Sequence, residues 1–482
     1  MQILERAARD PIDACFFRST KSICPESTKR LGYLLTTKWG DAVDSKPVQS
    51  AEAETAEIKS PRFVRLIVSS FLGTTLESFD FNIYTLLTPL VFNRLFFPQL
   101  EPAIATIASF SIFAVGIFSR PLGGVLFGHF GDRIGRKPTM VFTLLLVGVS
   151  TALMGIIPAY ESIGIWAPIC LTVLRFLQGV AYGGETTAAP VLVSESTSAK
   201  WRGTWSALAT TGILGGVLPA AAAVAWVAHL PTEDMLSWGW RVPFIGSMAV
   251  VLVGLYVRLK VEESPVFKAK VAGKKALRVP VAEVLRNFKK PTIIIMLISM
   301  SQSGIFFFTA TFGLSYAVQN LHLQRDTLLE GLMIGNAIGI FTITFFGWLS
   351  DIVGRRPVMA ACFVGSALYV WLGYFQLMAT GETFYIMLAV AVSPAILQPL
   401  SLGSGAAMFS EFFSDARLRF SGFGLGKQLG NVLGGGLLPV ASASIMAATN
   451  NSLVYVIMLF GGLNMLSAVA TYMMPETKNT SM

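Results

Sequence analysis

A short polar stretch that occurs twice constrains the fold of this sequence more than any other feature. Residues 128–138 read Gly-His-Phe-Gly-Asp-Arg-Ile-Gly-Arg-Lys-Pro, and residues 347–357 repeat the pattern at an offset of 219 positions. We call both stretches the repeated loops. The residues that recur in register are Gly128, Asp132, Gly135, Arg136 and Pro138, matched by Gly347, Asp351, Gly354, Arg355 and Pro357. An internal repeat of this kind indicates two related halves.

Two further matches at nearly the same offset support the duplication. Ser194-Glu195, with Arg202-Gly203 following, resembles Ser410-Glu411, with Arg419 and Gly422 following. Residues 215–219 (Gly-Gly-Val-Leu-Pro) resemble residues 435–439 (Gly-Gly-Leu-Leu-Pro). Because the order of the matches is the same in both copies, we expect the halves to be parallel repeats of six helices each.

The composition is that of a helical membrane protein. Hydrophobic residues make up 53% of the chain and charged residues 13%, about half the share in soluble proteins. Apolar runs of about 20 residues predict membrane-spanning helices. We place twelve, near 64–90, 103–128, 139–158, 164–193, 203–229, 241–260, 291–318, 328–349, 358–378, 384–409, 421–447 and 452–474. The predicted fold is an all-α membrane protein in two six-helix bundles.

Charges between the predicted spans fix the expected orientation. Lys and Arg gather in the repeated loops, in the stretch near 200, and in the connection from 261 to 290. Since positive residues stay on the cytoplasmic side, both termini should be cytoplasmic. The expected parts are a disordered tail (1–62), a first bundle (63–260), a linker (261–290), a second bundle (291–475) and a short tail (476–482).

Several function classes are disfavoured by the same sequence. The net charge of +9 lies mostly in short loops, so a nucleic-acid partner is not expected. Four cysteines without paired spacing and three scattered histidines indicate neither a disulfide framework nor a metal site. The glycine-rich run at 421–428 lacks a preceding strand and the residues of a phosphate loop, so no nucleotide is expected. We therefore expect no enzyme activity and no cofactor, and a chain that functions as a monomer in the lipid bilayer.

The chain resembles the major facilitator superfamily of transporters over residues 62–475. The repeated loop resembles the signature of that superfamily between helices two and three and between helices eight and nine. A finer resemblance is to the metabolite:proton symporter family. Its motifs here are residues 77–81 (Glu-Ser-Phe-Asp-Phe), 120–124 (Arg-Pro-Leu-Gly-Gly), 175–179 (Arg-Phe-Leu-Gln-Gly), 183–185 (Gly-Gly-Glu), 238–244 (Trp-Gly-Trp-Arg-Val-Pro-Phe) and 262–267 (Glu-Glu-Ser-Pro-Val-Phe). The resemblance implies transport by alternating access, driven by the proton gradient.

Charged residues inside predicted spans are the candidate functional residues, because their insertion is costly. Glu77 and Asp80 are three residues apart and Tyr84 is four beyond, so all three lie on one face of the first helix. Two close, buried carboxylates disfavour double ionisation, so one of them could carry the coupled proton. Residue pattern alone does not decide between Glu77 and Asp80, and either could instead be a permanently paired structural charge.

Three arginines are candidate contacts for an anionic substrate, because a guanidinium offers a fixed fork to a carboxylate. By resemblance to carriers of organic acids, Arg120 and Arg241 are the better substrate contacts. Arg175 could equally contact the substrate or pair with another charge within the protein. Gln178 and Glu185 could add polar contacts to the substrate or have only structural roles. Tyr84 completes the set of predicted substrate-binding residues. Lys427 could face the same cavity or sit at the cytoplasmic end.

We therefore expect a symporter that imports a small organic acid with protons. An exporter or exchanger on the same scaffold, and an importer of a zwitterionic osmolyte such as proline or betaine, remain alternatives. The repeated loops are expected to act as a latch on the cytoplasmic side rather than as a substrate site. The latch residues are Gly128, Asp132, Arg133, Gly135 and Arg136 in the first half, and Gly347, Asp351, Gly354 and Arg355 in the second.

Overall fold

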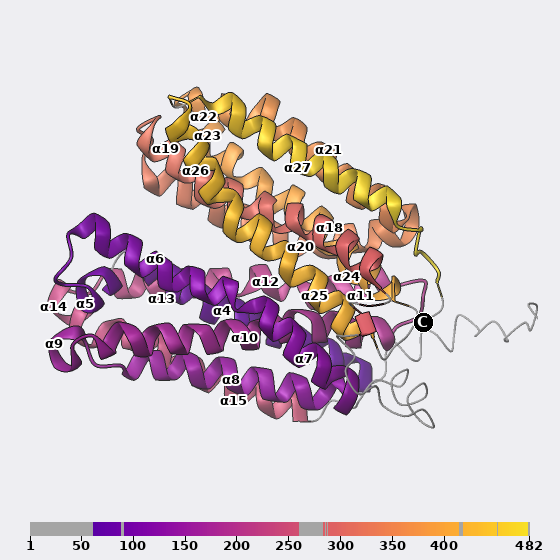
Figure 1. The fold of residues 1–482 in the computed structure, drawn as a ribbon, viewed down its shortest axis with the longest axis horizontal. Helices are drawn as coiled ribbons and strands as arrows, with labels where there is room; N and C mark the ends of the chain where they lie inside the picture. Colours follow the sequence, from indigo (N-terminus) through magenta and orange to yellow (C-terminus); the bar gives the residue numbers. More distant parts are fainter. Residues whose placement is uncertain are drawn as a thin grey trace, which may run out of the picture. The chain divides into compact units, whose positions relative to one another are not determined.

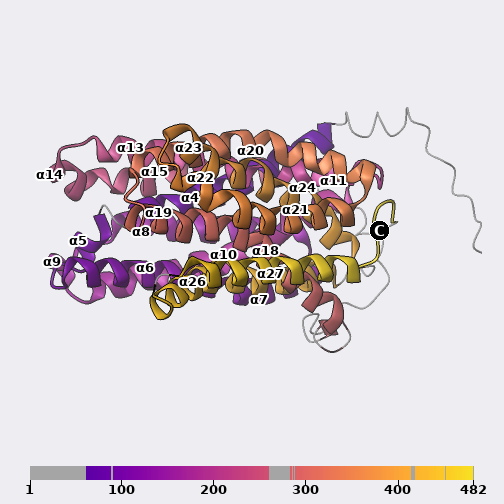
Figure 2. The same cartoon turned by 90° about the horizontal axis from the view of Figure 1, so that it is seen from above.

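Long helices that run along a common direction make up the described part of the chain (Figures 1 and 2). The computed structural model describes residues 61–87, 91–259, 283–284, 286, 288–413, 418–450 and 452–480. All of these residues belong to one compact unit, Ile58–Met482. Nearly all of the predicted tail 1–62 and most of the predicted linker 261–290 lie outside the described residues.

The helices of residues 61–259, which we call the first half, form six rods. Some rods consist of consecutive helices that follow one another with a single residue between them. The rods are α4 (Pro61–Leu87); α6 (Pro102–Phe118) with α7 (Arg120–Ile134); α8 (Arg136–Ile156); α10 (Trp166–Glu195); α11 (Arg202–Thr210) with α12 (Gly212–Gly215) and α13 (Val217–Ala228); and α15 (Arg241–Leu259). Short segments connect them: α5 (Asn93–Phe96), α9 (Tyr160–Ile163), α14 (Thr232–Asp234) and the π-helical turn η2 (Met235–Gly239).

Residues 289–473, the second half, form six more rods, four of which contain a π-helical turn. They are α18 (Lys289–Phe307), η3 (Phe308–Gly313) and α19 (Leu314–Gln319); α20 (Arg325–Val353); α21 (Arg355–Tyr369), η4 (Val370–Tyr374) and α22 (Phe375–Ala379); α23 (Thr383–Val392), η5 (Ser393–Leu397) and α24 (Gln398–Glu411); α25 (Arg419–Asn431), η6 (Val432–Leu437) and α26 (Leu438–Ala448); and α27 (Leu453–Met473). The all-helical fold class with twelve spans is confirmed.

Ten of the twelve rods are long and apolar enough to span a membrane by length and hydropathy among the described residues. The other two are α4, with 27 residues, and α10, with 30, which are also long enough to cross the bilayer. Both carry charged residues within their length, and these lower the mean hydropathy. The two rods that depart most from a plain membrane helix are therefore those with Glu77, Asp80 and Arg175.

The repeated loops are shorter than the sequence predicts. Helix α7 continues to Ile134 and α8 begins at Arg136, so one residue, Gly135, separates them. In the second half Gly354 alone separates α20 from α21. These glycines have φ of +116° and +114°, with ψ of 161° and 159°, a region that residues with a side chain rarely occupy. The same turn at equivalent positions supports duplication.

Replacing Gly354 with alanine is expected to destabilise the protein by about 1–3 kcal/mol, the usual cost of a strained backbone. The new Cβ atom would also lie 2.8 Å from Glu476 Oε2. Thermal unfolding of the purified protein in detergent measures the effect. The matched control is Gly461→Ala in α27, where a Cβ meets nothing within 4 Å. Equal unfolding temperatures for the two variants would contradict the strained-turn interpretation.

Small residues let the two halves pack closely at the end of the helices that carries the repeated loops, which we call the repeated-loop end. A Cβ atom added at Gly347 of α20 would lie 2.3 Å from the Cβ of Ala207 in α11. A Cβ atom added at Gly128 of α7 would lie 2.9 Å from the Cα of Ser421 in α25. Glycine at these positions permits the backbones to approach, as in other membrane helix pairs. The equivalent glycines therefore bring α20 onto α11 and α7 onto α25.

Candidate functional site

Two buried arginines of the first half lie against aromatic rings. Arg120 is the first residue of α7, and its Cζ atom lies 4.3 Å from the ring centre of Phe81 and 4.0 Å from that of Tyr182. Arg175 of α10 lies 4.3 Å from the ring centres of Phe81 and Tyr84. Aromatic faces attract cations, but they do not accept the directed hydrogen bonds of a guanidinium. The stacking therefore positions both cations without satisfying their N–H groups.

Both guanidinium groups retain nitrogen atoms without hydrogen-bond partners among the described residues. These are Nε and Nη2 of Arg120 and Nε and Nη2 of Arg175. The arginines are 5% and 0% exposed, respectively. Buried donors without acceptors are rare and costly, and for a charged group the cost is larger still. A bound carboxylate would supply the missing acceptors and the opposite charge.

Asp80 lies inside the first half, in a network of hydrogen bonds that ends on Arg175. Its Oδ2 atom accepts a hydrogen bond from the Thr151 hydroxyl of α8 at 3.0 Å. The amide of Gln178 donates to the same Thr151 oxygen at 2.7 Å, and Arg175 Nη1 donates to Gln178 Oε1. No hydrogen bond reaches Asp80 Oδ1 from the described residues. A fully buried carboxyl with one oxygen unsatisfied is better tolerated when it carries a proton.

Glu77 faces a different set of neighbours, although it shares the same helix face with Asp80. It lies close enough to Arg120, Tyr182 and Lys427 to interact electrostatically with each. Lys427 belongs to α25 of the second half, so Glu77 lies where the halves meet. The sequence suggested a coupled pair of carboxylates on one face. In the structure Asp80 points into the first half and Glu77 toward the second.

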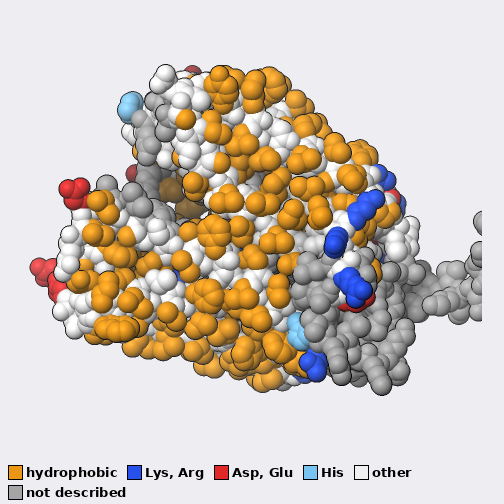
Figure 3. Space-filling view, viewed as in Figure 1, with side chains coloured by type: hydrophobic (Ala, Val, Ile, Leu, Met, Phe, Trp, Pro, Cys, Tyr) orange, Lys and Arg blue, Asp and Glu red, His pale blue; other side chains and the backbone are white. Residues whose placement is uncertain are grey.

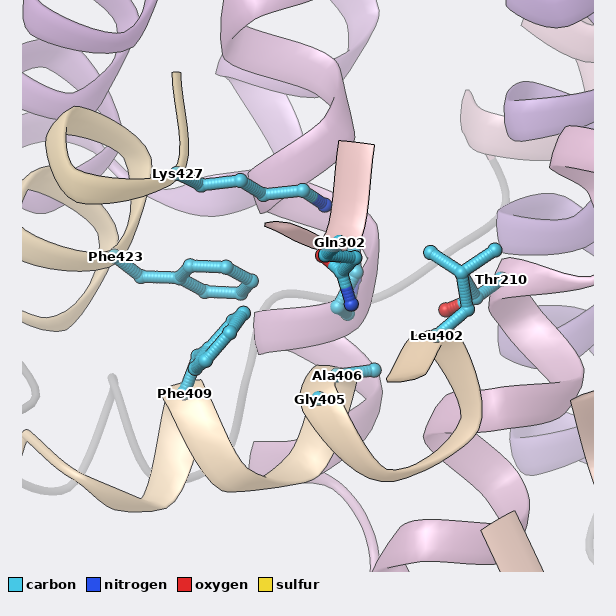
Figure 4. A pocket seen from close by; sticks show the side chains of 9 residues that line it. Thr210, Gln302, Leu402, Gly405, Ala406, Phe409, Phe423 and Lys427 are labelled. Carbon is cyan, nitrogen blue, oxygen red and sulfur yellow. The ribbon is translucent and has the colours of Figure 1, made fainter. Parts of the chain in front are cut away.

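A small cavity beside Lys427 lies between elements of both halves. Figure 4 shows the Lys427 side chain extending toward Gln302, with Phe423 and Phe409 nearby. Gln302 of α18 donates to the carbonyl oxygen of Ser401 at 2.8 Å. The neighbouring residue Gln428 donates to the carbonyl of Gly183 in α10 at 3.2 Å. Because Gly183 follows Tyr182, this contact brings Lys427 to the same region as Arg120.

The remaining predicted substrate-binding residues have different environments. Tyr84 is fully buried, contacts Phe92 with the two rings tilted, and lies under Arg175. The Glu185 side chain lies outside the described residues. Arg241 begins α15, and its Nη1 atom donates to the carbonyl oxygens of Gly155 and Ile157 at 2.9 and 2.8 Å. The structure therefore brings together Glu77, Asp80, Tyr84, Arg120, Arg175 and Gln178, but not Arg241.

Ion pairs between the halves close the repeated-loop end. Arg419 at the start of α25 contacts Glu195 at the end of α10, with 2.7 Å between Nη1 and Oε1. Arg202 at the start of α11 contacts Glu411 at the end of α24 at 3.0 Å. All four side chains are buried. Each half thus supplies one arginine and one glutamate to a crossed pair of buried salt bridges.

Asp351 adds a third connection between the halves. Its Oδ1 atom accepts a hydrogen bond from the backbone N–H of Gly203, and its Oδ2 atom accepts one from the N–H of Thr204, both at 2.8 Å. These N–H groups lie in the first turn of α11, where no helical acceptor is available. Arg355 holds the same carboxylate at 2.6 Å and also contacts Glu411 at 3.3 Å. One half therefore caps a helix of the other.

The segment after α27 is attached to the same cluster. Glu476 accepts hydrogen bonds from the backbone N–H groups of Arg355 and Arg356, and the Thr477 hydroxyl donates to Glu411 at 2.7 Å. Burial acts to raise the pKa of Glu476, but these N–H groups and that of Lys478 hold it below the ordinary value. The contribution of Glu476 to stability is therefore present above the ordinary pKa and is lost as the pH falls through the lowered one.

The predicted latch residues are only part of this closure. Gly128, Gly135, Gly347, Asp351, Gly354 and Arg355 occupy its turns and contacts, whereas Arg133 is exposed. The side chains of Asp132 and Arg136 lie outside the described residues. In the sequence, Glu195, Arg202, Glu411 and Arg419 are apparent only as marks of the repeat. These four residues are charged and lie at the ends of predicted spans, and this signal could have identified them.

Comparisons with known proteins agree with this architecture. Residues 65–279 match the family model described as "Sugar (and other) transporter". The chain is 36% identical to the shikimate transporter of Escherichia coli, over 89% of this chain and 98% of that protein. It is 33% identical to the inner membrane metabolite transport protein YhjE of Escherichia coli, over 87% of this chain and 95% of that protein. A solved structure of the proton:xylose symporter XylE aligns with a TM-score of 0.72 at 16% identity, covering 89% of this chain and 98% of XylE.

Proposed function

The chain belongs to the major facilitator superfamily of membrane transporters, and from this premise we propose that it is a proton-coupled symporter of a small organic acid. The observation that carries the proposal is the pair of buried guanidinium groups, Arg120 and Arg175, with nitrogen atoms lacking partners among the described residues. An organic acid offers the charge and the acceptors that both groups need. The similarity to a shikimate transporter supports the same substrate class.

We further propose that both termini lie in the cytoplasm of a bacterial cell, with the protein in the inner membrane. Figure 3 shows Lys and Arg side chains at the repeated-loop end and Asp and Glu side chains at the opposite end. The exposed residues Glu101, Glu161, Glu233 and Asp234 follow the same pattern. Positive charge favours the cytoplasmic side, so the closed repeated-loop end would face the cytoplasm.

In this orientation the structure represents a state closed toward the cytoplasm. The crossed salt bridges and the Asp351 cap hold that end together, and Figure 3 shows the surface hollowed between the halves at the opposite end. An acid would enter from that side, and its carboxylate would bind between Arg120 and Arg175. Protonation of Asp80 would release Arg175 for the substrate. The halves would then rock about the site, so that the repeated-loop end opens.

The ligand and the driving force are tested with the reconstituted protein. Thermal shift with shikimate, a dicarboxylate, betaine and xylose is expected to show stabilisation by an acid, because only ligands of the folded state stabilise it. Accumulation of that acid in proteoliposomes should require an inward proton gradient and vanish with a protonophore. Stabilisation by betaine alone would instead favour an osmolyte importer. Efflux driven by an opposite gradient, without uptake, would favour an exporter.

Arg120→Lys is expected to weaken acid binding about 10- to 100-fold, because a lysine keeps the charge but loses the fork of charge-assisted hydrogen bonds. Titration of the acid by thermal shift measures the loss. The control is Arg258→Lys, which changes a buried arginine whose Nη1 atom donates to the Met140 carbonyl at 2.6 Å. Equal affinities in wild type and Arg120→Lys would remove Arg120 from the substrate site.

A further inference from the structure

Three consecutive hydrogen bonds join Asp80 of α4 to Arg175 of α10. Arg175 donates to Gln178 Oε1, Gln178 Nε2 donates to Thr151 Oγ1 at 2.7 Å, and Thr151 Oγ1 lies 3.0 Å from Asp80 Oδ2. All four side chains are at most 2% exposed. Thr151 comes from α8, the third helix of this cluster. Because these groups are buried, water does not compete for their hydrogen bonds. The donor or acceptor role of one group therefore constrains the role of its neighbour.

The Thr151 hydroxyl lies within reach of two acceptors but has a single hydrogen. Asp80 Oδ2 is one acceptor, and the backbone carbonyl oxygen of Val147, at 2.9 Å, is the other. The hydroxyl oxygen has two lone pairs, one of which accepts from Gln178. The hydroxyl can therefore donate to Asp80, or turn toward Val147 and accept from Asp80 as well. Which arrangement forms depends on whether Asp80 carries a proton.

We propose that Thr151 is a positioning residue that lets Asp80 take up and release its proton while Gln178 stays hydrogen-bonded to Arg175, an inference that rests on the proposed proton-coupled transport. When Asp80 is ionised, Thr151 donates to its carboxylate. When Asp80 has taken up a proton from the medium, the carboxyl donates to Thr151 and the hydroxyl turns to Val147. The hydroxyl only rotates, so the proton stays on Asp80 and the network transfers none.

Electrostatics links this rotation to the substrate site. Arg175 is the charged group that faces Asp80, while α8 and α15 present the hydroxyls of Thr151 and Ser247. An ionised Asp80 attracts Arg175, whereas a protonated one does not. When the Asp80 carboxyl is neutral, Arg175 still donates its hydrogen bond to Gln178. The Nε and Nη2 atoms of Arg175 are then available to a substrate anion. Thr151 thus matches either charge state of Asp80, as donor to the carboxylate or acceptor from the carboxyl, while the Arg175–Gln178 hydrogen bond persists.

The test compares Thr151→Val, which removes the hydroxyl at nearly constant volume, with Thr151→Ser, which keeps it. Each reconstituted variant is assayed for uptake driven by a pH gradient, and for exchange of labelled acid against unlabelled acid at equal pH. Shikimate is the first probe. We expect Thr151→Val to lose at least about 10-fold in gradient-driven accumulation, to keep exchange within about twofold, and to show a flattened pH profile. Thr151→Ser should restore gradient-driven accumulation and the wild-type pH profile.

The matched control is Thr471→Val in α27, a fully buried threonine whose hydroxyl donates to the Ser467 carbonyl of its own helix. It should behave as wild type. Thr151→Ala replaces the valine variant if the latter fails to fold. Wild-type accumulation in Thr151→Val or Thr151→Ala would overturn the inference. If wild-type protein itself shows no dependence on a proton gradient, the proposed function fails instead, and the two failures are distinguishable.

Discussion

Replacing Asp80 with asparagine is expected to abolish accumulation of substrate against its gradient while leaving exchange across the membrane intact. Asparagine has nearly the shape of a protonated aspartate, and its amide can donate to Thr151 Oγ1 as the protonated carboxyl would. Because the side chain can no longer release a proton, the variant is held in the substrate-binding form. Binding and reorientation with substrate therefore persist, and coupling is lost.

The size of the effect follows from the driving force. A gradient of two pH units supports accumulation of about 100-fold for one coupled proton, since each unit is worth about 1.4 kcal/mol. Asp80→Asn should reduce this ratio to about one. The measurement is labelled-acid uptake into proteoliposomes with an acidic exterior, beside exchange at equal pH on both sides.

Glu77→Gln provides the comparison, because both carboxylates lie on one face of α4 but have different surroundings. Glu77 interacts with Arg120 and Lys427 at the boundary between the halves. We expect Glu77→Gln to change the affinity for the acid while gradient-driven accumulation remains. If Glu77→Gln loses the coupling and Asp80→Asn keeps it, the proton site is Glu77 and our assignment to Asp80 is wrong.

The fold and the face of the first helix could be predicted from the sequence because they depend on local patterns. Apolar runs of membrane-spanning length and a repeat at a constant offset do not depend on tertiary contacts. The i, i+3, i+7 spacing of Glu77, Asp80 and Tyr84 likewise fixes one face of any helix. The apolar runs also predicted that each of the repeated loops connects neighbouring spans, but not that a single glycine separates the helices. The charged residues of those loops continue the helices because a membrane helix can extend into the headgroup region.

The contacts of the site could not be predicted, because they depend on which helices are neighbours. Thr151 lies 71 residues from Asp80, and nothing in its own sequence context distinguishes it from other threonines in apolar runs. Arg241 was expected at the substrate because of its motif, yet its guanidinium is engaged with backbone carbonyls at the end of α8. The pairing of Glu195 with Arg419 likewise depends on crossing between halves. A sequence repeat identifies equivalent residues in the two halves, but it does not predict which residue of one half contacts which residue of the other.

The substrate site and the closed end are connected by the same helices. Helix α10 carries Arg175 and Gln178 and ends at Glu195, while α25 begins at Arg419 and carries Lys427. The Glu195–Arg419 salt bridge therefore joins two rods that both reach the candidate site. A ligand that pulls Lys427 and Arg120 together would move α25 relative to α7 and alter the geometry of that salt bridge. This connection offers a physical route from substrate binding to opening of the repeated-loop end.

Glu411→Gln is expected to shift the conformational balance strongly toward opening at the repeated-loop end. Glu411 contacts Arg202 of the first half at 3.0 Å and Arg355 of the second at 3.3 Å, and Thr477 donates to its Oε2 atom. Removing one partner of a buried ion pair costs about 3–5 kcal/mol, because the other charge stays buried without compensation. The cost falls on the closed state, because opening exposes the arginines to water.

Distances between spin labels measure this shift. One label is placed at Arg133 of α7 and one at Lys290 of α18, both exposed, in a protein whose native cysteines have been replaced. The closed state should lose population about 150- to 5,000-fold relative to the open state, which corresponds to the cost of about 3–5 kcal/mol. The distance distribution should therefore move from a short, narrow peak to a longer one.

The matched control is Glu382→Gln, which neutralises an exposed carboxylate immediately before α23 and should leave the distances unchanged. Glu195→Gln removes the charge from the equivalent position of the first half, where Arg419 also donates to the Phe413 carbonyl at 3.1 Å. It should shift the balance in the same direction, because each salt bridge crosses between the halves. Unchanged distances in both Glu411→Gln and Glu195→Gln would mean that packing of α7 on α25 and of α20 on α11 closes this end, and that the buried charges serve only to align the helices.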